Sequence, residues 1–268
     1  MKKKSSQLIY ITFLIFLIVS CTKEDIKLEG KTERFSINSQ IINDTYPIEV
    51  YLPMNYDSSQ PNLLIIGLDG ELFFEETAGI ISEKVSQGSM PPCVFIGVGN
   101  LKGRNRDYTP TAYEHGLGGA ENFYRFLKEE LIPEVAIRYN IKPTNEKILI
   151  GHSFGALFTH YAIFQNRADN PFNKFVSVGC SFWYDSGVIF EYEKNYFLNH
   201  TDLDARYYAG MGSLEGGVNL ASFDEMNERL QNRNYPKFKM NTQIIKKHGH
   251  SGSTIIGFKQ GIDYVFTN

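Results

Sequence analysis

One stretch of the chain, Lys147–Gly155, constrains the fold more than any other: it reads Lys-Ile-Leu-Ile-Gly-His-Ser-Phe-Gly. An apolar run leads into the pattern Gly-x-Ser-x-Gly, and a helical pattern over 156–165 follows it. A serine at such a strand-to-helix turn has a strained backbone, and the flanking glycines let strand and helix approach closely. The turn would present the Ser153 hydroxyl at the carboxyl edge of a sheet, beside the positive end of a helix. The stretch therefore predicts a nucleophile elbow; the alternative is a glycine-rich turn with a capping serine.

Short apolar runs bounded by Gly or Pro recur along the chain, and helical patterns alternate with them. The runs lie at 63–67, 93–98, 147–150, 174–178, 207–211 and 242–245. Fully apolar short strands are typical of a parallel sheet that is covered on both faces. The helical patterns lie at 120–138, 156–165, 223–231 and 256–265, and Pro133 should kink the first of them or end it early.

Two segments with alternating polarity, 34–39 and 46–52, flank the turn residues Asn43-Asp44 and predict an antiparallel hairpin. With the alternating strands and helices, this gives an α/β fold: a mostly parallel, doubly wound sheet with an N-terminal antiparallel hairpin, of the α/β-hydrolase type. The length of 268 residues suits one large core, and no internal repeat or linker divides the chain.

The first twenty residues have the composition of a targeting segment. Three lysines at positions 2–4 precede an apolar run at 8–19, which is too short to span a bilayer but suits a signal peptide. Ser20-Cys21 behind this run resembles a bacterial lipobox, and the resemblance implies cleavage before Cys21 and lipidation of its thiol. An ordinary secretory signal is the alternative. We expect a lipoprotein signal peptide at 1–20, a tether at 21–30 and the folded domain at 31–268.

A lipid anchor at Cys21 implies the outer membrane, on its periplasmic or surface face, because the residue directly after the cysteine is Thr22 and not Asp. The formal charge is −3, and losing the three leader lysines would make it −6. A nucleic-acid partner is not expected, because the chain outside the leader lacks a basic run. Cys93 and Cys180 should remain unpaired and buried, because their strand positions place them roughly 17 Å apart.

A catalytic serine needs a base, which in α/β-hydrolases follows the acid along the chain. That order leaves His248 and His250, in the loop after the last strand. The other histidines lie before Ser153, within the elbow, on the following helix or in a polar loop: His115, His152, His160 and His200. Glu215, in the loop after the 207–211 strand, is the candidate acid, and Asp185 is the alternative.

The oxyanion formed during acyl transfer needs two backbone N–H donors. Phe154, directly after the serine, should supply one. Gly70 or Glu71, in the loop after the 63–67 strand, should supply the other, while Asp69 pins that turn.

Several landmarks stand in an order that resembles the enterochelin-esterase-like branch of the putative esterase family, which also includes feruloyl and acyl esterases. The landmarks are Leu68-Asp69-Gly70-Glu71, Ile96–Asn100, Arg104 to Pro110, Gly118–Phe123, Phe126–Pro133, Gly151–Gly155, Ser181-Phe182-Trp183-Tyr184 and the His250 loop before Gly261. The resemblance implies that His250, a fixed step before Gln260-Gly261, is the base. It also implies that Arg104, Arg106, Trp183 and Tyr184 line the substrate cleft. The chain departs from the family pattern at Cys180 and at Lys247-His248-Gly249.

These observations predict a serine esterase with the triad Ser153, His250 and Glu215, working through an acyl-enzyme without metal or organic cofactor. The resemblance implies either a siderophore ester or an acyl or feruloyl ester on a polysaccharide as substrate. A catalytically silent lipoprotein that binds a ligand in the same cleft is the alternative from another class, and a peptidase is a minor third. The sequence leaves the oligomeric state open.

Overall fold

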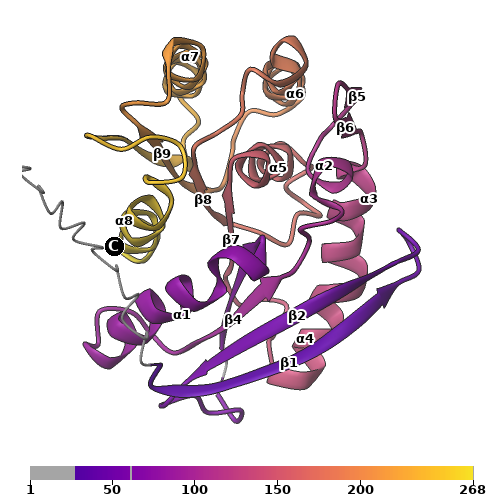
Figure 1. Cartoon of the computed structure of the whole chain (residues 1–268), viewed down its shortest axis with the longest axis vertical. Coiled ribbons are helices and arrows are strands. Elements are labelled where there is room, and N and C mark those ends of the chain that lie inside the picture. The colour runs from indigo at the N-terminus through magenta and orange to yellow at the C-terminus, as the bar shows by residue number, and fades with distance from the viewer. Residues whose placement is uncertain (1–27, 61, 268) are drawn as a thin grey trace, which may run out of the picture.

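The computed structural model describes residues 28–60 and 62–267, and an eight-stranded sheet forms its centre (Figure 1). The strand order is β1-β2-β4-β3-β7-β8-β9-β10. These strands are β1 (Gly30–Ser39), β2 (Asp44–Pro53), β3 (Leu63–Leu68), β4 (Cys93–Val98), β7 (Lys147–His152), β8 (Lys174–Val178), β9 (Arg206–Gly212) and β10 (Lys239–Ile245). All pairings from β4 to β10 along this order are parallel, which confirms the predicted sheet.

The predicted N-terminal hairpin is also confirmed, with both strands longer than expected. β1 and β2 pair antiparallel from Gly30 opposite Pro53 to Ser39 opposite Asp44, and β2 pairs antiparallel with β4. Asn43 has a φ of 57°, the left-handed conformation that asparagine tolerates better than most residues. The hairpin thus extends the parallel sheet beyond β4.

Helices cover both faces of the sheet (Figure 1). On one face lie α1 (Gly70–Ser86) and α8 (Thr254–Phe266); on the other lie α3 (Ala120–Arg125), the π-helix η1 (Phe126–Leu131), α4 (Ile132–Tyr139) and α5 (Phe154–Ile163). On that second side the apolar core also includes residues of α6 (Tyr184–Asn199) and α7 (Gly217–Arg233). The short α2 (Arg104–Asp107) precedes a small hairpin of β5 (Ala112–Tyr113) and β6 (Gly116–Leu117). Helices α1 and α6 were not among the predicted patterns.

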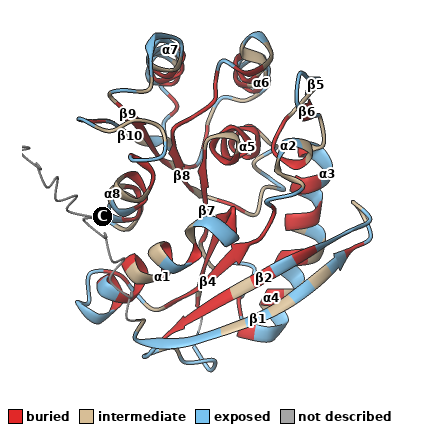
Figure 2. Ribbon diagram, in the orientation of Figure 1, coloured by how far each residue is buried: buried red, intermediate tan, exposed pale blue. Residues whose placement is uncertain are grey.

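The central strands are buried because their side chains alternate between two apolar layers (Figure 2). In β4, Val94, Ile96 and Val98 join the layer under α3 to α5, whereas Cys93 and Phe95 join the layer under α1 and α8. This two-sided burial explains why the strands read as continuous apolar runs rather than as alternating ones.

Of the two expectations for Pro133, a kink or an early end of the 120–138 helix, the early end is wrong. The helical path continues to Tyr139, and the segment just before the proline, Phe126–Leu131, is wound as a π-helix. Proline lacks an N–H and crowds the preceding turn, so a wider turn there accommodates its ring without breaking the helix.

The described chain is already part of the fold at its first residues. Leu28 packs beside the α1–α8 layer, and the Glu29 N–H donates to Ser82 Oγ at 3.1 Å. The fold therefore includes the last residues of the segment expected to be a tether. The expected signal peptide, the lipidation site Cys21 and the rest of that tether lie outside the described residues. Within the described ranges, no helix is long and apolar enough to cross a membrane.

Candidate active site

The predicted nucleophile elbow is present as a strand–turn–helix. β7 ends at His152, α5 begins at Phe154, and Ser153 between them has φ 59° and ψ −120°, outside the regions that suit a residue with a side chain. Its N–H donates to the Val178 carbonyl oxygen at 3.0 Å, which fixes the turn to β8. A Cβ on Gly151 would lie 2.3 Å from the Gly155 carbonyl oxygen, so strand and helix meet as closely as the motif predicts.

A carboxylate and an imidazole from two other strand ends meet at the same edge of the sheet. His250 Nδ1 lies 2.7 Å from Glu215 Oε2, and the Glu215 side chain is fully buried whereas that of His250 is 42% exposed. Asp185, the alternative acid, instead accepts a hydrogen bond from the Thr111 hydroxyl at 2.6 Å. His248 accepts the Leu214 N–H through its backbone carbonyl. The structure thus pairs Glu215 with His250, and not with His248.

The Glu215 carboxylate is held by donors on both oxygens. Oε1 accepts the Gly212 N–H at 2.9 Å, while Oε2 faces His250. Burial by itself would raise the pKa of Glu215, but the hydrogen bonds from His250 and from the Gly212 N–H outweigh it and hold this pKa below the usual value of 4.5. The carboxylate is therefore ionised at neutral pH and can orient and stabilise a protonated imidazole.

Two helix starts converge beside Ser153. The first N–H groups of α5 and of α1 have no acceptor within their own helices. Such free N–H groups at a helix start can bind an anion. The two starts are in contact, since a Cβ on Gly155 would lie 3.4 Å from Asp69 Oδ2. The predicted donors Phe154, Gly70 and Glu71 are thus at adjoining positions. The Glu71 carboxylate itself accepts the N–H groups of Asn100 and Leu101, at 2.9 and 3.2 Å.

Asp69 fixes the α1 loop, as the sequence suggested. Its φ is 54°, its N–H donates to the Tyr108 hydroxyl at 3.2 Å, and its buried carboxylate receives Nε and Nη2 of Arg104 at 3.1 and 3.2 Å. Burial raises the pKa of Asp69, although Arg104 opposes this effect. The Arg104 guanidinium also lies over the Phe154 ring, 5.8 Å from its centre. Arg104 thus contacts the residue before α1 and the first residue of α5.

The two predicted cleft arginines differ in their surroundings. Arg104 borders Phe154, although two of its nitrogens are committed to Asp69. Arg106 bonds to Asp107, Asp44 and Tyr46, none of which lies beside Ser153 in the sequence or is among the predicted site residues. The structure therefore brings Arg104 to the site and assigns the polar contacts of Arg106 to holding α2 against β2.

The two predicted cleft aromatics both lie beside Phe154. The Trp183 ring is 6.4 Å from the Phe154 ring and 39% exposed. Tyr184 is buried 5.4 Å from Phe154, and its hydroxyl lies 2.8 and 2.9 Å from the carbonyl oxygens of Thr111 and Tyr113, between which its one proton is shared. Trp183 thus presents free aromatic surface, whereas Tyr184 fixes the β5–β6 hairpin as part of the wall.

The expectation of two unpaired, buried thiols is confirmed for Cys93 and Cys180. Burial raises the pKa of Cys93 to about 12 and that of Cys180 well above its usual value, so neither thiol is a reactive nucleophile at neutral pH.

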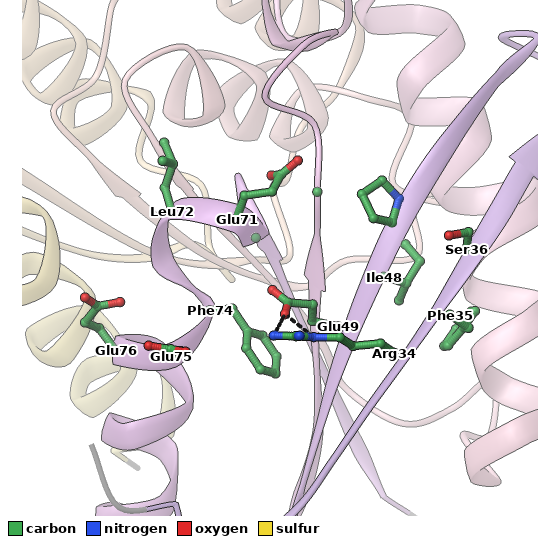
Figure 3. A pocket seen from close by; sticks show the side chains of 13 residues that line it. Arg34, Phe35, Ser36, Ile48, Glu49, Glu71, Leu72, Phe74, Glu75 and Glu76 are labelled. Atoms are coloured by element: carbon green, nitrogen blue, oxygen red, sulfur yellow. Dashed lines mark hydrogen bonds and ion pairs between the residues drawn. The ribbon is translucent and has the colours of Figure 1, made fainter. Parts of the chain in front are cut away.

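A hollow of about 610 Å³ lies apart from this site, between α1 and the β1–β2 hairpin (Figure 3). Its lining contains an ion pair of Arg34 with Glu49 at 2.6 Å and no histidine or cysteine. It shares the residues Gly70 and Glu71 with the site described above. The lining holds no serine paired with a histidine base, so the strand ends, and not this hollow, form the candidate active site.

Sequence reasoning missed three contacts of the site. Tyr113 stacks edge-on against Tyr184 at 5.8 Å, the Ser253 hydroxyl donates to the His250 carbonyl oxygen at 2.9 Å, and His152 Nε2 lies 3.1 Å from that same oxygen. Ser253 precedes the last helix, a position typical of a capping serine, which is a signal the sequence offered. Nothing in the sequence near Tyr113 indicates its contact.

Comparison with known proteins places the chain in a family. A model of the family described as putative esterase matches residues 39–248. Ferri-bacillibactin esterase BesA of Bacillus subtilis is 33% identical over 154 residues, 47% of this chain and 51% of BesA. A siderophore triacetylfusarinine C esterase of Aspergillus fumigatus is 26% identical over 158 residues, 53% of each chain. The matches thus span about half the length of these curated relatives.

The fold also has counterparts among solved structures. The BES protein from Bacillus cereus superposes with a TM-score of 0.78 at 22% sequence identity, over 89% of this chain and 97% of that protein. This likeness supports the α/β-hydrolase type of fold that the strand order indicates. Because the family model covers well over half of the chain, the chain belongs to the putative esterase family.

Proposed function

We propose that this protein is a serine esterase that cleaves a carboxylic ester, with Ser153 as nucleophile, His250 as base and Glu215 as acid. The observation that carries the proposal is the contact of His250 with the buried Glu215 at 2.7 Å, at the sheet edge where Ser153 stands in a strained turn. Nucleophile, acid and base follow one another along the chain in the order of α/β-hydrolases.

The reaction begins when Ser153 Oγ attacks the ester carbonyl carbon and its proton passes to His250 Nε2. The imidazolium that forms donates through Nδ1 to the Glu215 carboxylate, which stabilises its charge. The tetrahedral oxygen is bound by the N–H of Phe154 and by that of Gly70 or Glu71. The carbon–oxygen bond to the alcohol then breaks, and His250 returns the proton to the leaving oxygen. A water molecule repeats the sequence on the acyl-enzyme and frees the acid.

We propose a siderophore ester as the substrate. One relative is named as an esterase of ferri-bacillibactin and the other as an esterase of the siderophore triacetylfusarinine C, which supports this choice. The exposed Trp183 face, the Phe154 ring and the Arg104 guanidinium would together suit an aromatic, oxygen-rich acyl group. An acyl or feruloyl ester on a polysaccharide has the same chemistry and is the second candidate that the substrate test includes.

We also propose that Cys21 anchors the protein to the outer membrane. Gly30, at the start of β1, pairs with Pro53, the last residue of β2. Because β2 runs antiparallel to β4, this end of β2 lies beside the start of β4. Residue 30 is therefore at the amino edge of the parallel strands. The candidate site lies at the carboxyl edge. An anchor on this side would leave the site facing away from the lipid. Labelling of cells with radioactive palmitate tests the proposal: the wild type should take up label and Cys21→Ala should not.

Hydrolysis of p-nitrophenyl acetate and butyrate by the wild type and by Ser153→Ala tests the esterase proposal. We expect turnover by the wild type and a loss of at least about 10³-fold in the variant. Wild-type rates equal to those of the variant would contradict it and would favour a ligand-binding protein without catalysis. Ferric enterobactin, methyl ferulate and acetylated xylan, compared by kcat/KM, then decide between the substrate classes; we expect the siderophore to be the best.

A further inference from the structure

The proposed nucleophile and base come from strands that are not neighbours. Ser153 follows β7 and His250 follows β10, and the sheet order places β8 and β9 between them. The backbone hydrogen bonds of the sheet therefore do not join the two loops directly. One side chain makes that connection: His152, the residue before the serine, whose Nε2 lies 3.1 Å from the His250 carbonyl oxygen.

The chemistry of this contact fixes the state of the His152 ring. A carbonyl oxygen only accepts hydrogen bonds, so Nε2 must carry a proton and donate it. The Ser253 hydroxyl donates to the same oxygen at 2.9 Å and lies 3.4 Å from Glu215 Oε1. Two donors thus hold the backbone of His250, while Glu215 holds its ring.

His152 is built into the protein as a neutral group. It is 7% exposed, its ring lies 5.6 Å from that of Phe73 and 4.5 Å from that of His250, and burial together with the neighbouring His250 lowers its pKa to about 4. A positive charge at this distance would oppose the imidazolium that His250 becomes during catalysis. The neutral ring avoids this repulsion and keeps its donor.

The space around the two rings is shaped for their contact. Gly179 has φ +61°, and a Cβ there would lie 3.0 Å from His152 Nε2 and 3.1 Å from His250 Cε1 and Nδ1. A side chain at this position would push the rings away from each other. The absence of a Cβ at position 179 therefore lets the strand before the serine and the base loop meet.

We propose that His152 is a positioning residue that sets the distance and angle of His250 relative to Ser153, through its Nε2–H hydrogen bond to the His250 backbone. The inference rests on the esterase function proposed above. The common alternative is a buried histidine that only fills space, and the two differ in what a substitution does. A space-filling ring can be replaced by any side chain of similar size, whereas a positioning donor can be replaced only by another donor.

The matched pair His152→Gln and His152→Met separates these readings, because the two side chains have similar length and only Gln keeps an N–H donor. We expect the Met variant to lose about 10- to 100-fold in kcat on p-nitrophenyl butyrate, with KM within about twofold, since a displacement of about 1 Å at a catalytic group has costs of this size. The Gln variant should retain most of the wild-type kcat. His200→Gln, in a loop outside the site, serves as the control for a histidine substitution.

A second measurement makes the test independent of turnover. The proton shared by His250 Nδ1 and Glu215 should give a downfield proton NMR signal in the wild type and in His152→Gln, and a weaker or absent one in His152→Met. Equal kcat values for the Met and Gln variants, or equal NMR signals, would overturn the inference. If the wild type shows no esterase activity, the proposed function is contradicted, and the NMR comparison still decides the role of His152. Thermal unfolding identifies a variant that fails to fold.

Discussion

Replacing Glu215 by Gln changes one charge at the centre of the site while keeping the shape of the side chain. Oε1 accepts the Gly212 N–H at 2.9 Å, so the amide of a glutamine must keep its oxygen there and turn its NH₂ toward His250. That NH₂ needs an acceptor, and it favours the imidazole tautomer with a bare Nδ1 and a protonated Nε2. Such a ring cannot take the proton of Ser153.

The magnitude follows from the lost charge and the wrong tautomer. Two unit charges about 4 Å apart attract by about 4 kcal/mol at an effective dielectric constant of about 20, which corresponds to about 10³-fold in rate. The 42% exposure of His250 lets solvent screen part of this attraction, whereas the tautomer change adds to the loss. We therefore expect kcat to fall by about 10³-fold.

The assay is kcat on p-nitrophenyl butyrate for Glu215→Gln, with Asp185→Asn and Glu228→Gln measured alongside. Glu228 is an exposed acid on α7 and is the control for removing a carboxylate. Asp185→Asn tests the alternative acid, and we expect little loss because Asp185 bonds to Thr111. A kcat for Glu215→Gln within tenfold of the wild type, or a larger loss in Asp185→Asn, would refute the reasoning.

Three further results are expected. Gly151→Ala should lose about 3 kcal/mol or more of unfolding free energy, measured in urea, since its Cβ would lie 2.3 Å from a backbone oxygen. The control Gly217→Ala, with open space around it, should keep the wild-type stability. Equal stability losses in the two variants would contradict the prediction. Burial lowers the pKa of His160 to about 3. As pH drops, this histidine is therefore protonated in the unfolded chain first, and the free energy of unfolding should fall from about pH 6.5 downward. His160→Asn should lessen this fall between pH 7 and 5 by about 2 kcal/mol, and an unchanged pH dependence of stability would contradict the prediction. Trp183→Ala should raise KM for methyl ferulate more than for p-nitrophenyl acetate, and equal effects would exclude an acyl contact.

The sheet was predictable because its strands are buried on both faces. The central strands are short, mostly apolar runs, and the predicted bounds of β4 and β8 agree with the structure to the residue. For β4, Pro92 and Gly99 mark both ends. Helix α6 was missed because Asp185, Ser186 and Gly187 near its start all have left-handed backbone angles, and their sequence reads as a turn. Local pattern also misled at Pro133, where tertiary packing retains a π-wound helix.

Chain order located the candidate acid and base, whereas it did not give their contacts. The order of an α/β-hydrolase chain led to Glu215 after β9 and left His248 and His250 after β10, and the family resemblance chose His250. The roles of Arg104 and Arg106 depend on which carboxylates fold beside them, Asp69 in one case and Asp107 with Asp44 in the other. The pairings of Arg104 with Asp69 and of Arg106 with Asp44 join residues far apart in the chain, and a single sequence does not reveal them.

The most direct measurement of the central claim is covalent labelling of Ser153. A fluorophosphonate reacts with a serine only where a base has activated its hydroxyl and an oxyanion site binds the phosphoryl oxygen. We expect peptide mass spectrometry of the labelled wild type to find one adduct, on Ser153, and Glu215→Gln to label far more slowly. No adduct on Ser153, or equal labelling of wild type and Glu215→Gln, would contradict it.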